Sequence, residues 1–320
     1  MLPTPGDVLA AAHRLRPVVH RTPLVPSAAL SAAAGVAVHL KCENLQRTGS
    51  FKVRGAYNAL ALLPHELRAR GIVASSAGNH GLGVAYAAGL LGVRARIFVP
   101  TNAPAVKRDG IIALGAEVDA TQPHYDSAHE AAVAYGEVHG MTFVNPCAGA
   151  PLLAGQGTVA LEILEELPGV RTLVVCVGGG GLVGGIAALV RAVAPDVRIV
   201  GAQSDQTNAM AASLAAGRRV QVEVPPTLAD GLAGQIDDEG FAIGQFALDE
   251  MVTVSEEEIA SAIAFLAREH ELRVEGSGAV GVAALRASRI SALDGPVAVI
   301  VSGGNIDDAR WARITSETQR

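Results

Sequence analysis

The sequence predicts an α/β fold in which parallel sheets are covered by helices on both faces. Short apolar runs typical of buried strands recur along the chain, at residues 36–41, 71–75, 95–99, 172–177, 198–202 and 296–301. Alanine-rich segments typical of helices lie between them, for example residues 80–91 and 184–194. This alternation predicts parallel strands buried on both faces. In such folds, ligands bind at the carboxyl ends of the strands.

The composition is that of a well-packed globular protein. The 320 residues are 50% hydrophobic and 18% charged, which argues against disorder and allows one large or two ordinary domains. Aromatic residues make up only 3%, so we expect a core of Ala, Val, Leu and Ile. The formal net charge is −6 and no basic cluster exceeds Arg218-Arg219, so nucleic acid is not an expected partner.

The N-terminal segment and the spacing of the cysteines favour a reducing compartment. The first seventeen residues lack the apolar core of a signal peptide, and no long apolar run free of charges and glycine clusters predicts a membrane span. The three cysteines, Cys42, Cys147 and Cys176, are scattered and do not have metal-ligand spacing. We therefore expect a cytoplasmic protein without a membrane partner.

Lys52 stands at an unusual place in the predicted fold. It follows the small residues Thr48-Gly49-Ser50 and precedes a helical run at 53–60. The helix dipole disfavours a cation at a helix start. An exposed lysine is the ordinary interpretation, and only the rest of the chain can give Lys52 a function.

A glycine-rich loop follows the strand predicted at 172–177. Residues 178–181 are four consecutive glycines, and a helix follows. Glycines let the backbone approach an anion, and the helix start offers free N–H groups, so the loop predicts a phosphate site. A G-x-G-x-x-G pattern begins at Gly179, but the next strand ends in Gln203 where dinucleotide sites often carry an acid. A tight turn that binds nothing is the alternative.

Two other predicted strands end in small hydrogen-bonding residues. Residues 75–81 read SSAGNHG and follow the strand at 71–75, and residues 302–305 read SGGN and follow the strand at 296–301. An ordinary turn would use Ser, Gly and Asn for the same conformational reasons. Three such strand ends together with Lys52 favour one shared ligand site.

Several segments, in order along nearly the whole chain, resemble one known family. Residues 41–56 (KCENLQRTGSFKVRGA) resemble the cofactor-lysine segment of pyridoxal-phosphate (PLP) enzymes of the tryptophan-synthase-β type. The similarity is greatest to the threonine/serine dehydratases (ammonia-lyases) and to serine racemases. Further matching segments are SAGNH (76–80), AGQGT (154–158), GGGGL (178–182), LADG (228–231), VEGSG (274–278) and SGGN (302–305).

The resemblance implies a two-domain fold with the cofactor in the interdomain cleft. It places residues 1–70 and 148–320 in a large PLP-binding domain and residues 71–147 in a small domain. The chain stops soon after Ser302, so we expect no C-terminal regulatory domain of the kind that longer relatives carry. A homodimer or a homotetramer is the expected assembly.

The resemblance also assigns roles to residues of the matching segments. Lys52 would form the Schiff base with PLP and later remove the α-proton of the substrate, and Phe51 would pack against the ring. Asn79 would bind the ring hydroxyl oxygen and Ser302 the pyridine nitrogen. The phosphate would be held by Gly178, Gly179, Gly180, Gly181 and Leu182.

The expected substrate is a hydroxy amino acid whose carboxylate binds at the segment 76–80. The residues implied there are Ser76, Ala77, Asn79 and His80. His80 is either an acid or base, or a residue that only structures a helix start. Serine racemases carry a serine where Ala77 stands, and alanine has no proton to deliver, so Ala77 favours elimination. L-threonine or L-serine would give a 2-oxo acid and ammonia.

Other activities remain as alternatives to threonine or serine elimination. They are amino-acid racemisation, β-replacement, and elimination from 3-hydroxyaspartate, phenylserine or a hydroxyectoine-pathway intermediate. A nicotinamide dehydrogenase is suggested only by the glycine run and leaves Lys52 without a role. A binding protein without activity is the last alternative.

Some positions depart from the family pattern or have no assigned role. Gln203 and Ala209 stand where some relatives have carboxylates for a divalent cation, so no metal of that kind is expected, and a monovalent ion stays open. Cys147 and the neighbouring alanine are small and predict a pocket widened for a bulkier β-substituent. Asp230 and Glu275 either line the site or brace a loop.

Overall fold

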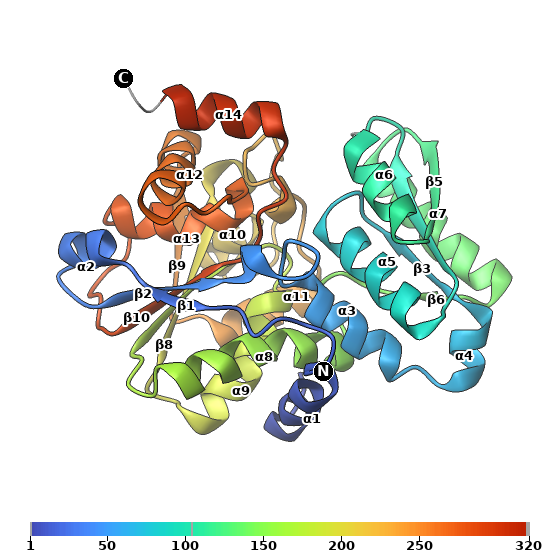
Figure 1. The fold of residues 1–320 in the computed structure, drawn as a ribbon, viewed down its shortest axis with the longest axis horizontal. Coiled ribbons are helices and arrows are strands. Elements are labelled where there is room, and N and C mark those ends of the chain that lie inside the picture. Colours follow the sequence, from blue (N-terminus) through green and yellow to red (C-terminus); the bar gives the residue numbers. More distant parts are fainter. Residues whose placement is uncertain (1, 104, 318–320) are drawn as a thin grey trace.

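The computed structural model describes residues 2–103 and 105–317 and contains two separate sheets flanked by helices (Figure 1). The larger sheet has six strands in the order β1-β2-β10-β7-β8-β9, and the smaller has four in the order β5-β4-β3-β6. The α/β fold with parallel-type sheets is thereby confirmed. Among the described residues, no helix is both long and apolar enough to cross a bilayer.

Central strands of the larger sheet are buried on both faces. The strands β7 (Thr172–Cys176) and β10 (Val297–Val301) are buried at every residue, as their runs of Val, Leu and Ile predict. Parallel neighbours are β2 (Val38–Cys42), β8 (Arg198–Ser204) and β9 (Glu250–Val254), and only β1 (Leu24–Pro26) is antiparallel. The register pairs Val299 with both Leu40 and Val174.

Helices cover both faces of the larger sheet. Figure 1 shows α8 and α9 on one side of it and α12 and α13 on the other. The helix bounds in this half are α1 (Pro5–Leu15), α2 (Ala28–Ala34), α8 (Ala150–Glu166), α9 (Gly181–Val193), α10 (Ala209–Ala216), α11 (Asp238–Ala247), α12 (Glu256–His270), α13 (Gly276–Arg286) and α14 (Asp308–Glu317).

The smaller sheet has its own two-sided core. Its strands are β3 (Ile72–Ser75), β4 (Ala95–Pro100), β5 (Glu117–Gln122) and β6 (Thr142–Phe143), all parallel. Side chains of successive strand residues point to opposite faces, so Ile72 and Ala74 join one apolar cluster while Val73 joins the other. The helices of this half are α4 (His65–Arg70), α5 (Asn79–Leu91), α6 (Ala105–Ala113) and α7 (Tyr125–His139).

The helix α3 (Lys52–Ala61) lies between the two halves (Figure 1). It packs against α5 of the smaller half and against α8 of the larger. Contact with α8 is so close that a Cβ on Gly55 would lie 2.4 Å from Gln156 Nε2, and one on Gly155 would lie 2.5 Å from the Arg54 carbonyl. Only glycine therefore fits at these crossing points.

The six predicted strands all occur, and four others were not predicted from the sequence. The unpredicted strands are β1 and β9, the edges of the larger sheet, and β5 and β6, the edges of the smaller sheet. Edge strands are partly exposed, so β5 (EVDATQ) lacks the apolar run that marks a buried strand. The four strands of the smaller sheet fall within residues 72–143, while the proposed domain limits at 70/71 and 147/148 stay a prediction.

Candidate active site

Lys52 begins α3 at the carboxyl edge of the larger sheet. The preceding residue, Phe51, donates its backbone N–H to the carbonyl of Ser302 (3.1 Å), directly after β10. The Lys52 Nζ donates to the carbonyl of Pro146 (3.0 Å), and it lies 5.3 Å from the centroid of the Phe51 ring. No side chain caps the start of α3. The lysine is thus held by backbone contacts from two distant segments.

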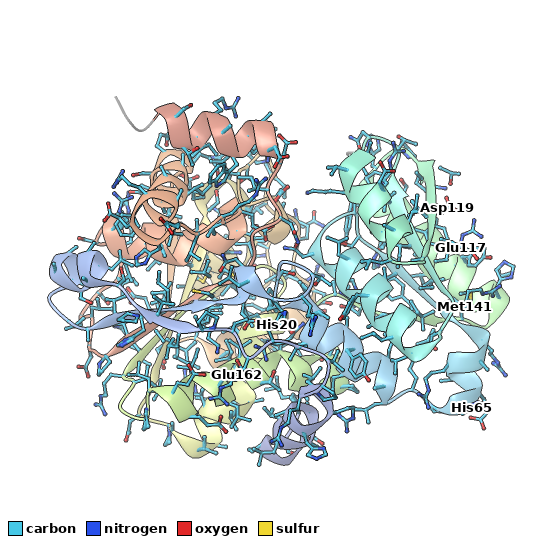
Figure 2. All side chains as sticks on the ribbon, in the orientation of Figure 1. His20, His65, Glu117, Asp119, Met141 and Glu162 are labelled. Atoms are coloured by element: carbon cyan, nitrogen blue, oxygen red, sulfur yellow. The ribbon has the colours of Figure 1, made fainter. Side chains whose placement is uncertain are left out.

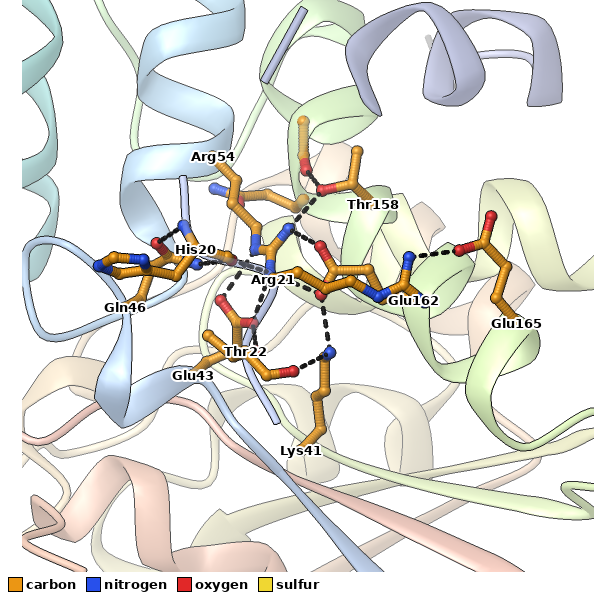
Figure 3. Close-up of polar contacts among 12 residues, drawn as sticks. His20, Arg21, Thr22, Lys41, Glu43, Gln46, Arg54, Thr158, Glu162 and Glu165 are labelled. Atoms are coloured by element: carbon orange, nitrogen blue, oxygen red, sulfur yellow. Dashed lines mark hydrogen bonds and ion pairs between the residues drawn. The ribbon is translucent and has the colours of Figure 1, made fainter. Parts of the chain in front are cut away.

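A buried cluster of charges anchors the same helix two residues further on, at Arg54 (Figure 3). The Arg54 side chain is almost fully enclosed, and its guanidinium forms paired hydrogen bonds with two carboxylates, Glu43 (2.7 and 2.9 Å) and Glu162 (2.7 and 3.0 Å). Lys41 Nζ also reaches Glu162 (2.7 Å). Two cations and two anions balance, which a buried cluster requires.

Ionisation of this cluster depends on mutual neutralisation. Burial disfavours the charged form of Glu43, yet its pKa lies below the ordinary value because the charge and hydrogen bonds of Arg54 outweigh burial. Figure 2 shows Glu162 in the larger half, far from Glu117 and Asp119 in the smaller half. We infer that the cluster fixes α3, and with it the position of Lys52.

The four glycines after β7 form a turn that leads directly into α9. Gly180 has a φ of +94°, a conformation that side chains disfavour, and no side chain caps the helix. Segment 145–149 presses against this loop: a Cβ on Gly179 would lie 2.8 Å from Cys147 Sγ, and one on Gly181 would lie 2.9 Å from Cys147 Cα. The loop therefore presents the main-chain N–H groups of an uncapped helix start to a ligand, and its four glycines present no side chains.

The segment after β3 leads into α5, which is also uncapped. Gly78 is the residue before the helix and forms no side-chain cap, while its N–H donates to Ser76 Oγ (3.2 Å). Asn79 begins the helix and donates from Nδ2 to Glu275 Oε1 (2.6 Å), and its Oδ1 accepts from Asn305 Nδ2 (2.6 Å). Asn79 thus joins the smaller half to the loop after β10.

His80 and Ala77 differ in their surroundings. The His80 ring is buried and its Nε2 lies 2.9 Å from the carbonyl of Val144. Burial, together with the nearby charge of Lys52, lowers the pKa of His80 to about 3, so the ring is neutral at neutral pH. Ala77 is half-buried and contributes no polar side-chain atom. Assignment of either residue to the substrate stays a prediction.

Ser302 lies buried at the end of β10, next to the end of β7. Burial raises the pKa of the Cys176 thiol to about 11, although a hydrogen bond with Ser302 acts in the opposite direction. Cys176 is therefore a neutral thiol at neutral pH, and Ser302 is likewise neutral. Ser302, the residue predicted to bind the pyridine nitrogen, therefore brings no charge to that position.

These features fit a phosphate-bearing ring cofactor. The glycine loop is a cradle in which any Cβ on Gly179 or Gly181 would collide with Cys147, so the main chain alone is presented there. Buried Oγ atoms of Ser50 and Thr48, close in sequence to Lys52, lack a protein hydrogen-bond partner in the described structure. Lys52, the glycine loop, Asn79 and Ser302 are brought together by the contacts above, while their roles stay predictions.

Sequence reasoning left three features of this site without a role or did not find them. Pro146 holds Lys52 through its carbonyl, which no side-chain pattern could indicate. Glu275 contacts Asn79 directly, so it lies at the site. Asp230 forms an ion pair with Lys107 of α6 (3.3 Å). Within residues 2–103 and 105–317, no group of three or more His, Cys, Asp or Glu side chains is placed to hold a metal ion.

Comparison with known proteins agrees with this geometry. The family model described as "Pyridoxal-phosphate dependent enzyme" matches residues 15–303. An L-threonine ammonia-lyase of Thermotoga maritima is 47% identical over 302 residues, 94% of this chain and 75% of the relative. An L-threo-3-hydroxyaspartate ammonia-lyase of a Pseudomonas species is 39% identical, covering 96% and 97%. The structure of maize serine racemase superposes with a TM-score of 0.93 at 32% identity, covering 100% and 99%.

Proposed function

Because this chain belongs to the family of pyridoxal-phosphate dependent enzymes, we propose that it is an ammonia-lyase. It eliminates the β-hydroxyl group of a hydroxy amino acid such as L-threonine or L-serine and releases a 2-oxo acid and ammonia. The observation that carries this proposal is the convergence of the Lys52 amine with the uncapped glycine loop and with Ser302. Similarity to ammonia-lyases over most of the chain supports it.

Residues of four segments hold the cofactor in this proposal. Main-chain N–H groups of Gly178–Leu182 bind the phosphate at the start of α9. Asn79 donates to the ring hydroxyl oxygen, Ser302 faces the ring nitrogen, and Phe51 packs against the ring. When bound, PLP supplies an electron sink for charge that develops at the α-carbon of the substrate.

Lys52 is the residue that moves the proton. Its amine lies where both halves meet and donates a hydrogen bond to the Pro146 carbonyl. In its neutral form the amine accepts the α-proton of the substrate. Ser302 is an uncharged partner, so it does not hold a proton on the ring nitrogen as a carboxylate would. The weaker electron sink favours elimination, in which the leaving hydroxyl group takes the electrons.

The segment 76–80 receives the substrate carboxylate and selects the outcome. Its contribution is the uncapped start of α5 together with the Ser76 hydroxyl. Ala77 offers no proton to the opposite face of the α-carbon, so the chain lacks there the second acid that racemisation requires. His80 remains neutral and bonded to Val144, and we assign it the placement of this segment.

A second candidate is elimination from a β-hydroxy amino acid with a larger side chain. The specific observation is that Cys147, a small residue, lies against the glycine loop with no bulky neighbour at position 148, which is alanine. The relative that acts on L-threo-3-hydroxyaspartate supports this candidate.

We also propose a cytoplasmic homodimer or homotetramer, with residues 71–147 forming the small domain.

The visible spectrum and product analysis of the purified protein test the proposal. We expect a visible absorption band of bound PLP that is absent in Lys52→Ala and present in the control Lys107→Arg, which keeps the positive charge that pairs with Asp230. We expect 2-oxo acid from L-threonine or L-serine, and comparison with L-threo-3-hydroxyaspartate and phenylserine identifies the side-chain preference. A band without 2-oxo acid but with D-amino acid would indicate a racemase. No band would indicate a binding protein without PLP.

A further inference from the structure

Glu275 is a buried carboxylate that does not cap the helix it precedes. It stands directly before α13, where an acidic side chain usually accepts from the helix N–H groups, yet no such hydrogen bond forms. Only 5% of the residue is exposed. Its Oε1 instead accepts from Asn79 Nδ2 across the boundary between the two halves. Burial of a carboxylate without a directly bonded cation is costly, which points to a role at this position.

The partners of Asn79 determine which way its amide faces. A side-chain amide has two N–H donors and one carbonyl acceptor. Asn305 donates from Nδ2 both to the Thr48 carbonyl (2.8 Å) and to Asn79 Oδ1 (2.6 Å). The Thr48 carbonyl can only accept, so the amide of Asn305 cannot flip. Asn79 Oδ1 therefore faces Asn305, and Nδ2 faces Glu275 with one N–H to spare.

Close packing ties Glu275 to the Ser302 turn as well. The Glu275 backbone N–H donates to the carbonyl of Gly303 (3.1 Å). A Cβ on Gly303 would lie 2.4 Å from Glu275 Oε1 and 3.1 Å from Asn79 Nδ2, so a larger residue at 303 would displace the carboxylate. One side chain thus links the two segments that carry Asn79 and Ser302.

We propose that Glu275 is a positioning residue of the cofactor site: with Asn305 it fixes the Asn79 amide so that the remaining N–H is presented to the ring hydroxyl oxygen of PLP. This inference rests on the proposed function, which assigns Asn79 to that oxygen. Glu275 acts through Asn79 and is not itself a catalytic residue.

The charge of Glu275 changes close to neutral pH. Burial raises its pKa to about 7, Asp230 adds to this, and the hydrogen bond from Asn79 acts in the opposite direction. Titratable groups that face it are Asp230 before α11, Lys107 on α6 and Cys176 at the end of β7. The ring hydroxyl oxygen therefore gains a negative neighbour, one amide away, as the pH rises through neutrality.

Measurements on the PLP-loaded protein test this role. The variants are Glu275→Gln, Glu275→Ala and Asn79→Ala, with Glu258→Gln as a matched control because Glu258 caps α12 instead. Equilibrium dialysis gives the Kd of PLP, and visible spectra are recorded between about pH 6 and 8. We expect Glu275→Ala and Asn79→Ala to weaken PLP binding by about tenfold each, the loss of one buried hydrogen bond. The control should match the wild type.

The spectrum separates a positioning role from a merely structural one. Wild-type protein should show a change of the visible band through neutral pH that Glu275→Gln lacks, while Glu275→Gln still binds PLP within about threefold of the wild-type Kd. This readout also decides the matter if Glu275→Ala does not fold. An unchanged pH response in Glu275→Gln would overturn the inference. Wild-type binding by Glu275→Ala beside weak binding by Asn79→Ala would overturn it and leave the role of Asn79 standing. Wild-type binding by Asn79→Ala would overturn both the inference and the assignment of Asn79 to the ring hydroxyl oxygen, whereas failure of the proposed function itself would appear as the absence of 2-oxo acid from the wild type.

Discussion

Glu43 and Glu275 are both buried glutamates, and their pKa values are shifted in opposite directions. Glu43 precedes α3 and is fully enclosed, and its pKa is held below the ordinary value against the effect of burial. Glu275 precedes α13 and is 5% exposed, and burial raises its pKa to about 7. The difference lies in the partners: Arg54 binds Glu43 directly, whereas Glu275 is bound by uncharged amides, the Asn79 side chain and the Asn305 backbone N–H.

Burial alone therefore does not determine the state of a carboxylate. A directly bonded guanidinium compensates for lost hydration and keeps Glu43 charged at neutral pH. Amides offer dipoles but no charge, which leaves Glu275 able to change its charge near neutrality. The Glu43 cluster holds a helix in place, and the Glu275 site stands where a cofactor is predicted. Perturbed groups of the second kind concentrate at functional sites.

Removing the cation from the Glu43 cluster should have the largest effect. Arg54→Met leaves Glu43 and Glu162 without the guanidinium that both contact. Unpaired buried charge should lower the free energy of unfolding by about 3–5 kcal/mol. Urea denaturation at neutral pH measures this loss. The control is Arg289→Met, which breaks an exposed pair with Glu258 and should change the free energy of unfolding far less. Equal losses in both variants would contradict the role given to the cluster.

The same substitution at the two glutamates should change stability in opposite directions. Glu43→Gln removes a charge that Arg54 stabilises, so we expect a loss of about 2–3 kcal/mol at neutral pH. Because the folded pKa of Glu43 is lowered, its contribution is present above the ordinary value of 4.5 and is lost as the pH falls through the folded pKa. The cost of Glu43→Gln, measured by urea denaturation, should therefore shrink in acid.

Glu275→Gln should stabilise the cofactor-free protein at alkaline pH. The folded pKa of about 7 lies above the ordinary value of 4.5, so the wild type loses stability as the pH rises between these values. The full difference corresponds to about 3 kcal/mol, an upper limit for the gain at pH above about 8. Near pH 4 the two proteins should be equally stable apart from the small effect of the amide itself. Denaturation curves across this range would contradict the assignment if the gain did not grow with pH.

Local patterns were enough to predict the frame of the fold and the segments of the site. Buried strands such as β7 and β10 are continuous apolar runs, and the glycine loop is recognisable by composition alone. Contacts between distant segments carry no such signal. Asn79 and Glu275 are separated by 196 positions and Arg54 and Glu162 by 108, so neither pair could be found without the folded chain. The edge strand β5 was missed because its exposure dilutes the apolar pattern.

The smallest expected effect comes from the charge nearest to Glu275. Asp230 raises the pKa of Glu275, and it is half exposed and paired with Lys107. Asp230→Asn removes the repulsion and leaves Lys107 as the charged neighbour, so the pKa of Glu275 should fall toward its ordinary value, only slightly because solvent screens the site. The upper end of the pH range over which the wild type loses stability should move to lower pH by the same amount, while the lower end, set by the unfolded chain, stays in place. Salt should diminish the difference. Asp294→Asn, which removes an exposed partner of Arg171, is the matched control and should leave this range unchanged. A shift to higher pH in Asp230→Asn would mean that Lys107 leaves the site together with its partner, and that the ion pair, not Asp230 alone, sets the ionisation of Glu275.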